Sequence, residues 1–235
     1  RLLVLLGAGV VVAAAIQSYI KLQSIPVQQI SVKGELLYTM PEELQAMVQP
    51  ALAGGFLNAD LQHMRRQLEA LPWVYEATVR RRWPNALEIH VVEELPIARW
   101  GDAGFLNHEG AIFLPAEVAG WQDLPVLQGP EGSARSLMAS YQRVIEILGP
   151  LGLTVERLAV DDRSQLEAVL DTGMTLVLGG DAFRERMQRF VAVYQSELAP
   201  RLAEVERVDL RYESGVAVKF NEPPAVAETD NESRT

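Results

Sequence analysis

The sequence predicts an α+β fold in which a transmembrane helix precedes two globular domains. Three observations support this prediction: an uncharged run over residues 2–20, a strand–helix–helix–strand–strand order over residues 25–95, and a series of short strands with two helices over residues 96–220. At 235 residues, the chain is long enough for two medium-sized domains. Its content of 49% hydrophobic and 22% charged residues is typical of a globular protein.

Residues 1–21 are predicted to form the transmembrane helix. The uncharged run almost reaches the roughly 20 apolar residues that a helix needs to cross a bilayer. Tyr19 and Lys21 suit the headgroup zone at its end. A cleaved signal peptide is the alternative, because the alanines at 13–15 resemble a cleavage site. Since the chain does not begin with Met, we expect the cytoplasmic segment upstream of the span to be missing or very short, and the bulk of the protein to be exported.

Residues 25–95 are predicted to form a small α+β domain. Apolar and polar side chains alternate over residues 25–34, which indicates a strand. Pro41, followed by two glutamates, begins a helix, and apolar residues at helical spacing from 61 to 71 indicate a second one. Two strands follow, on either side of the turn signal Pro84-Asn85. This order predicts two helices on one face of a three-stranded sheet.

Residues 96–220 are predicted to form a larger domain with a mixed antiparallel sheet and helices. The expected elements are a hairpin at 105–113, helices at about 134–148 and 182–198, three strands between those helices, and two strands at the end. The last two strands lie within VDLRYESGVAVKF, residues 208–220, and are joined by a turn at 213–215. Residues 221–235 are polar and contain two prolines, so we expect a disordered tail.

Composition and motifs argue against several classes of function. A formal net charge of −10 is unlike that of a nucleic-acid-binding protein, and the absence of cysteine excludes thiolate catalysis and Cys-based zinc sites. His63, His90 and His108 are far apart and form no closely spaced ligand pair. Nucleophile-elbow and phosphate-loop motifs are absent as well. We therefore expect no enzymatic activity, no cofactor, no metal site and no small-molecule substrate.

One basic run, Arg80-Arg81-Arg82, has two interpretations. It can be a solvated strand face, which we favour because a charge run needs no partner to exist, or it can be an electrostatic contact for an acidic partner.

The final hairpin predicts an open sheet edge, because a terminal strand can leave one side unpaired. The backbone of Val216–Phe220 could accept a strand from a partner protein. Alternation predicts that Val216, Val218 and Phe220 face the core and that Ala217 and Lys219 face outward. Tyr212 offers the aromatic contact area that is common in binding hot spots. The alternative is that Tyr212 and Phe220 are ordinary core residues.

The order of these segments resembles the FtsQ/DivIB family of bacterial cell-division proteins. The densest match is the pattern W-P-x-x-L-x-I-x-V-x-E-x-x-P-x-A-x-W from Trp83 to Trp100, and residues 25–95 resemble the POTRA domain of that family. FLNHEGAIF, LPVLQGP and RVDLRYESGVAVKF resemble the second, sheet-rich domain in the same order. The resemblance implies a POTRA-type βααββ domain followed by a larger mixed antiparallel-sheet domain with helices.

What the resemblance implies is a single-pass inner-membrane protein of the division septum, periplasmic in its bulk, that scaffolds septal wall synthesis. Members bind FtsB and FtsL in the periplasm and influence the septal synthase complex. Contact with FtsB resembles strand addition at the edge made by the last strands. The residues implied in partner binding are Arg211, Tyr212, Ser214 and Gly215, which match the family's R-Y-x-S-G turn, and Val216, Val218, Phe220 and Arg163. Phe220 stands where the family often has a larger aromatic residue.

Two other functions stay open. A POTRA-bearing periplasmic adaptor of a secretion or outer-membrane assembly system would share the unit at residues 25–95. A periplasmic wall-modifying enzyme would need a cleft with converging polar groups.

Overall fold

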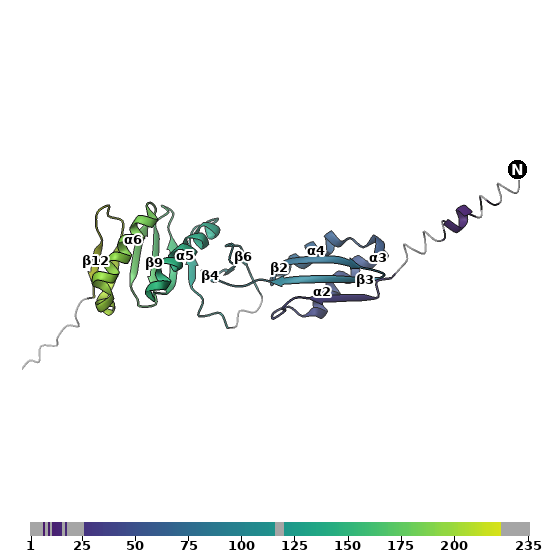
Figure 1. Cartoon of the computed structure of the whole chain (residues 1–235), viewed down its shortest axis with the longest axis horizontal. Helices are drawn as coiled ribbons and strands as arrows, with labels where there is room; N and C mark the ends of the chain where they lie inside the picture. The colour runs from purple at the N-terminus through teal and green to yellow at the C-terminus, as the bar shows by residue number, and fades with distance from the viewer. Residues whose placement is uncertain are drawn as a thin grey trace, which may run out of the picture. The chain divides into compact units, whose positions relative to one another are not determined.

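The computed structural model describes residues 7, 9, 11–15, 17, 26–115 and 120–221 (Figure 1). Contacts divide the chain into two compact units, Arg1–Leu95 with Phe113–Val118 and Pro96–Ile112 with Ala119–Thr235. Of the predicted transmembrane helix at 1–21, residues 7, 9, 11–15 and 17 are described and are helical, and the rest lies outside the described residues. Of the predicted tail at 221–235, all but residue 221 lies outside them. In the part of the chain that is described, no helix combines the length and the apolar character needed to span a membrane.

The first unit follows the predicted order of strand, helices, strand and strand. Its elements are β1 (Gln29–Lys33), α2 (Pro41–Val48), a 3-10 turn (Gln49–Leu52), α3 (Gly55–Asn58), α4 (Leu61–Glu69), β2 (Val74–Arg82) and β3 (Ala86–Glu93). The sheet order is β1-β3-β2, with β1 parallel and β2 antiparallel to β3. The prediction for this domain is confirmed, and the short helix α3 is an addition to it.

Both longer helices of this unit cover one face of the sheet. Leu44 of α2 and Met64 of α4 are fully buried in one core with Leu87 and Ile89, which lie two residues apart on β3 and so share a face. At the start of α4, the Asp60 side chain accepts a hydrogen bond from the His63 backbone N–H at 2.9 Å. This side chain satisfies one of the backbone donors that every helix start leaves without an intrahelical partner.

Arg81 departs from the solvated strand face predicted for the three arginines. Its Nε donates to the Phe56 carbonyl at 3.0 Å, and its Nη2 donates to the carbonyls of Leu57 and Ala59 at 3.1 and 2.7 Å. Alternation along β2 turns this one side chain away from its two neighbours, toward the end of α3, where helix carbonyls lack intrahelical partners. The prediction is therefore wrong for Arg81.

Glu93, the last residue of β3, binds the loop of residues 37–39 through its carboxylate. The Glu93 side chain accepts hydrogen bonds from the backbone N–H groups of Leu37, Tyr38 and Thr39 at 2.7, 3.1 and 2.7 Å. The Tyr38 ring stacks on Trp73 with 4.2 Å between ring centroids. The loop is thus ordered although Leu37 is 81% exposed.

The second unit is built on a nine-stranded mixed sheet. Its elements are β4 (Ala98–Trp100), β5 (Gly104–Leu106), β6 (Ile112–Phe113), β7 (Val126–Gln128), α5 (Ala134–Leu148), β8 (Val155–Val160), β9 (Leu166–Leu170), β10 (Thr175–Gly179), α6 (Phe183–Val193), β11 (Val205–Asp209) and β12 (Ala217–Phe220). The strand order is β12-β11-β10-β9-β8-β7-β4-β5-β6. The predicted mixed sheet with helices is confirmed, and with it the α+β class.

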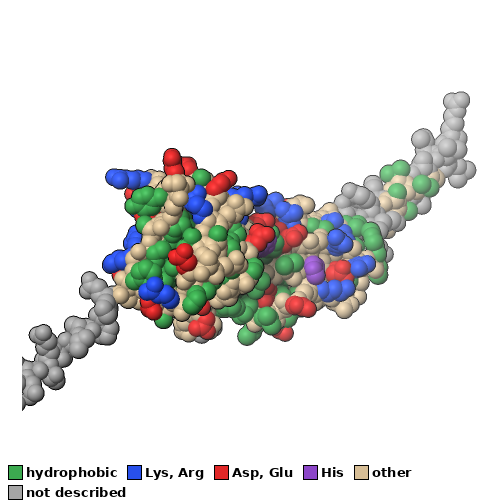
Figure 2. Space-filling view, turned by 60° about the vertical axis from the view of Figure 1, so that its left-hand side comes forward, with side chains coloured by type: hydrophobic (Ala, Val, Ile, Leu, Met, Phe, Trp, Pro, Cys, Tyr) green, Lys and Arg blue, Asp and Glu red, His purple; other side chains and the backbone are tan. Residues whose placement is uncertain are grey.

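Two helices cover one face of this sheet and leave charged side chains on the other. Helices α5 and α6 lie against the sheet (Figure 1). Their apolar residues, such as Val144 and Phe190, are buried in one core with inward residues of the strands, such as Leu158 and Val208. The outward positions of the same strands carry exposed or half-buried charges, namely Arg157, Glu167, Arg207 and Lys219. On the face of the molecule that Figure 2 shows, side chains of both charges are scattered among apolar ones.

We expect Arg81→Ala to lower the free energy of unfolding of the first unit by about 1–3 kcal/mol, because three carbonyls lose their donor. Denaturant unfolding of the full chain, followed by far-UV circular dichroism, measures the change. The matched control is Arg80→Ala, since Arg80 is exposed on the opposite face of the same strand. Equal stability of the two variants would contradict the structural role of Arg81.

Glu88 predicts an acid-sensitive contribution to the stability of the first unit. Hydrogen bonds from Lys33 and then Arg82 lower the pKa of the Glu88 carboxyl from its ordinary 4.5 to about 2. Because this pKa is lower in the folded chain than in the unfolded one, the contribution is complete above about pH 4.5 and is lost as the pH falls toward 2.

Thermal unfolding between pH 6 and pH 2 tests this expectation, with pH values spanning the window of about 2 to 4.5. The midpoint of the wild type should fall more steeply on acidification than that of Glu88→Gln. Glu76→Gln, at an exposed position of β2, is the control and should keep the wild-type slope. If Glu88→Gln and the wild type lose stability in parallel, the ion pairs of Glu88 with Lys33 and Arg82 contribute nothing measurable.

Candidate functional site

Strand β12 forms one edge of the nine-stranded sheet. It pairs antiparallel with β11 and, among the described residues, with no other strand. The Asn221 backbone N–H donates to the Glu204 carbonyl at 2.7 Å, and its side-chain Nδ2 donates to the Ala203 carbonyl at 3.0 Å. These bonds hold the end of β12 in place, and its other side is paired with no strand in the part of the chain that the structure describes.

The direction of the backbone groups along β12 follows from the same bond. In an antiparallel pair, alternate residues direct their N–H and C=O groups to the same side. Because Asn221 faces Glu204, Ala217 and Lys219 also face β11. The N–H and C=O groups of Val218 and Phe220 therefore point to the open side, where a further strand could bind.

A loop of residues 210–216 joins the two strands and is longer than the predicted turn at 213–215. Arg189 of α6 holds this loop, because its Nη2 donates to the carbonyls of Tyr212 and Leu210 at 2.8 and 3.4 Å. At the start of the loop, the Asp209 carboxylate accepts the Arg211 backbone N–H at 3.0 Å and the Arg211 Nη2 at 2.6 Å. The hydrogen bond from the Arg211 side chain lowers the pKa of Asp209. The loop is thus fixed from both sides.

The side chains of the loop and strand divide into exposed and half-buried groups. Tyr212 is 59% exposed and Phe220 is 38% exposed, whereas Val216 and Val218 are half-buried against the core. Ser214 is exposed and Gly215 is half-buried. The expectation that Val216 and Val218 face the core is therefore confirmed.

The same expectation is wrong for Phe220. Its ring lies under the Arg201 guanidinium, 4.6 Å from the ring centroid, and not in the core. Alternation does place Phe220 on the side of Val218, but at the end of the edge strand the neighbouring 3-10 segment Ala199–Glu204 supplies Arg201 in place of an apolar cover. Exposure of Tyr212 and Phe220 also rules out the alternative that both are ordinary core residues.

The structure brings together two predicted residues that are distant in the sequence. Arg163 and Arg211 line one hollow of about 630 Å³, together with Arg207 and the carboxylates of Asp161 and Glu167. An ion pair of 3.0 Å joins Arg207 to Glu167. The sequence prediction missed Arg207. Alternation along the strand places Arg207 and Asp209 on the same outward face, and this signal could have indicated Arg207.

The loop that presents Arg163 is held by its own carboxylate. Asp161 Oδ1 accepts the backbone N–H groups of Arg163 and Gln165 at 2.9 and 2.7 Å, and Ser164 has a φ of 60°. This tight turn projects Arg163 beside the outward face of the sheet.

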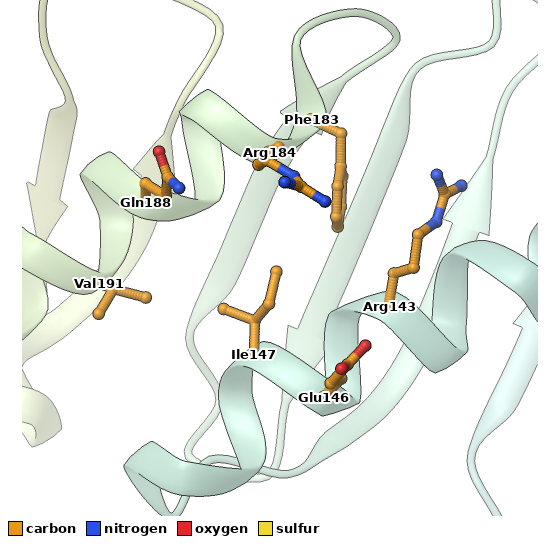
Figure 3. Close-up of a pocket in the computed structure, with 7 residues that line it drawn as sticks. All are labelled: Arg143, Glu146, Ile147, Phe183, Arg184, Gln188 and Val191. Carbon is orange, nitrogen blue, oxygen red and sulfur yellow. The ribbon is translucent and has the colours of Figure 1, made fainter.

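A second hollow, of about 590 Å³, lies between α5 and α6 (Figure 3). It is lined by Arg143, Glu146, Ile147, Phe183, Arg184, Gln188 and Val191. The Arg143 guanidinium lies 5.4 Å from the centroid of the Phe183 ring. These side chains offer apolar and ionic contacts but include no hydroxyl or thiol nucleophile beside a base. Within the described ranges, no group of three or more His, Asp or Glu side chains could hold a metal ion.

Comparison with known proteins assigns both units. The family model "POTRA domain, FtsQ-type" matches residues 25–94, and the model "Cell division protein FtsQ/DivIB, C-terminal" matches residues 98–211. The second match ends at Arg211, so the exposed tyrosine and β12 lie beyond it.

Similar proteins cover most of the chain. The cell division protein FtsQ of Shewanella oneidensis is 35% identical over 85% of this chain and 76% of its own length. For the protein of the same name from Xanthomonas campestris, the identity is 36% over 88% of this chain and 74% of that protein. The cell division protein FtsQ of Escherichia coli is 33% identical over 90% of this chain and 79% of its own length. The chain therefore belongs to the FtsQ/DivIB family of cell division proteins.

Proposed function

We propose that this protein is a non-enzymatic scaffold of the bacterial division machinery and that the open edge of β12 is its binding site for FtsB. In this proposal, residues 1–21 anchor the chain in the inner membrane, and the two units lie in the periplasm at the division septum. The scaffold also binds FtsL and helps to control septal peptidoglycan synthesis through the septal synthase complex. The observation that carries the proposal is an ordered terminal strand with one open side.

Strand addition suits this edge for physical reasons. The outward backbone groups of Val218 and Phe220 can form main-chain hydrogen bonds with a partner strand, and the side chains at alternate positions can set its register. Tyr212 stands next to the edge on a loop that Arg189 and Asp209 hold in one conformation. A rigid exposed aromatic side chain loses little entropy on binding, so it is suited to act as an anchor.

The hollow at the outward face extends the proposed site beyond the strand. Arg163, Arg207 and Arg211 line it, and all three are exposed. Guanidinium groups bind carboxylates through paired hydrogen bonds. Arg207 and Arg211 already pair with Glu167 and Asp209, so we expect an acidic side chain of FtsB to contact Arg163, next to the strand that FtsB adds to β12.

The match over residues 98–211 favours the division scaffold over a POTRA-bearing adaptor of a secretion or outer-membrane assembly system, which would share only the first unit.

Tyr212→Ala should weaken binding to FtsB by about 2 kcal/mol or more, roughly 30-fold in Kd, without unfolding the protein. Titration of the full chain with FtsB, with circular dichroism as the check on folding, measures the effect. Ile145→Ala is the matched control, because Ile145 is a 38% exposed apolar residue on helix α5. Unchanged affinity in a folded Tyr212→Ala variant would remove this residue from the site.

Two substitutions at one position separate strand addition from side-chain contact. Phe220→Ala and Phe220→Pro both remove the aromatic ring, but only proline also removes the backbone N–H that points to the open side. Proline is tolerated on edge strands where its nitrogen faces outward, so both variants should fold. If FtsB adds a strand, Phe220→Pro should bind it at least about tenfold more weakly than Phe220→Ala, the loss of roughly one hydrogen bond. Equal affinities would argue that the partner contacts side chains only.

A further inference from the structure

Trp83 is a large aromatic side chain that remains mostly open to solvent at the tip of the β2–β3 hairpin. It is 70% exposed, yet its ring packs edge-on against the buried Phe56 with 5.2 Å between centroids. The hairpin beneath it is fixed by the hydrogen bonds of Arg81 to the carbonyls of α3 residues. The side chain is therefore held in position, which lowers the entropic cost of any contact that it makes.

The chain enters the first unit at the same end as this hairpin tip. Strand β1 runs parallel to β3 with Gln29 opposite Ala86, and the Gln28 N–H donates to the Asn85 carbonyl at 2.9 Å. Asn85 belongs to the same turn as Trp83. The start of β1 and the tip of the hairpin are thus side by side (Figure 1).

This arrangement limits how far Trp83 can lie from the membrane that the chain is proposed to cross. Lys21 is the last residue of the predicted span, and the chain from Lys21 to Gln28 covers at most about 25 Å even when fully extended. The headgroup region adds roughly 5–8 Å outside the hydrocarbon core. The hairpin tip therefore lies within a short tether of the bilayer surface, the environment in which tryptophan side chains are enriched.

The neighbours of Trp83 fit a lipid surface. Arg82 is next to it and pairs with Glu88 at 3.1 Å, but its side chain is 64% exposed and so stays accessible to a phosphate. Pro84 is exposed on the other side of Trp83. An indole ring places its apolar body toward acyl chains and its N–H toward headgroups, and a long cationic side chain reaches lipid phosphates. An aromatic residue beside an arginine thus provides both contacts that the interface of an anionic membrane offers.

We propose that the tip of the β2–β3 hairpin, with Trp83 at its centre and Arg82 beside it, docks on the phospholipid headgroup layer, a proposal that rests on the membrane span proposed for residues 1–21. The contact limits the tilt of the first unit relative to the membrane. It is a second attachment to the bilayer, made by the folded domain itself.

The chain contains no cysteine, so single cysteines at chosen positions can be labelled without background. Trp83→Cys and Leu37→Cys form a matched pair, because Leu37 is 81% exposed and lies at the other end of β3, where Glu93 binds its N–H. The full chain is reconstituted into vesicles of phosphatidylethanolamine and phosphatidylglycerol, and each cysteine carries an environment-sensitive fluorophore. Lipids with a nitroxide near the headgroup should quench the label at position 83 and shift its emission to the blue, with neither effect at position 37.

The tryptophan itself is tested in the unlabelled chain. The nitroxide lipids should quench part of the tryptophan emission of the wild type, and this part should be lost in Trp83→Phe, which keeps a ring against Phe56. A quenched fraction of the same size in both proteins would overturn the docking role of Trp83.

Other outcomes separate this proposal from those made above. Equal quenching at positions 83 and 37, or none at 83 in a chain that resists alkaline carbonate extraction, would overturn docking and leave the anchor standing. A label at position 83 that responds to added FtsB but not to nitroxide lipids would assign the tip to a protein partner instead. Extraction by carbonate would overturn both anchor and docking, whereas binding of FtsB at β12 is measured independently.

Discussion

The antiparallel pairing of β12 with β11 sets the direction of the backbone groups that the edge of the candidate site presents. Asn221 closes the end of this pair on the carbonyls of Ala203 and Glu204, and Asp209 orders the other end through Arg211. Without that register, the outward backbone of Val218 would have no defined direction, and the loop that carries Tyr212 would be held by Arg189 alone. The open edge is therefore a property of the pairing between the two strands and not of any single side chain.

An open edge is also a hazard, because it can pair with another copy of the same sheet. Strand β12 has only four residues, and its exposed Lys219 forms an ion pair with Glu206 at 2.6 Å. Short length and a lysine are two of the ways in which natural edge strands avoid pairing with themselves. Exposed ion pairs of this kind add little stability. The role of Lys219 here is therefore to limit which strands can pair with the edge of β12.

Residue patterns predicted the elements well where one face is buried, as in the βααββ order of residues 25–95 and the helix at 134–148. They failed where the outcome depends on what another segment brings. Arg81 was assigned to solvent because α3, the source of its carbonyl partners, has too weak a pattern to be predicted. Alternation gives the side of the sheet on which Phe220 lies, but it does not say whether an apolar residue or Arg201 covers that side. The meeting of Arg163 with Arg211 follows only from the strand order β8-β9-β10-β11, which no local pattern contains.

The two hydrogen bonds that Arg189 donates to the loop also connect the loop to the interior of the second unit. On helix α6, this arginine stands two residues after the fully buried Met187 and directly before the fully buried Phe190. Any shift of α6 on its core therefore displaces the carbonyls of Leu210 and Tyr212 as well. Substitutions of the apolar residues of α6 would then be expected among mutants selected for defective division. If such a mutant lost partner binding, the loss would come from a displaced loop, although it would look like damage to the interface itself.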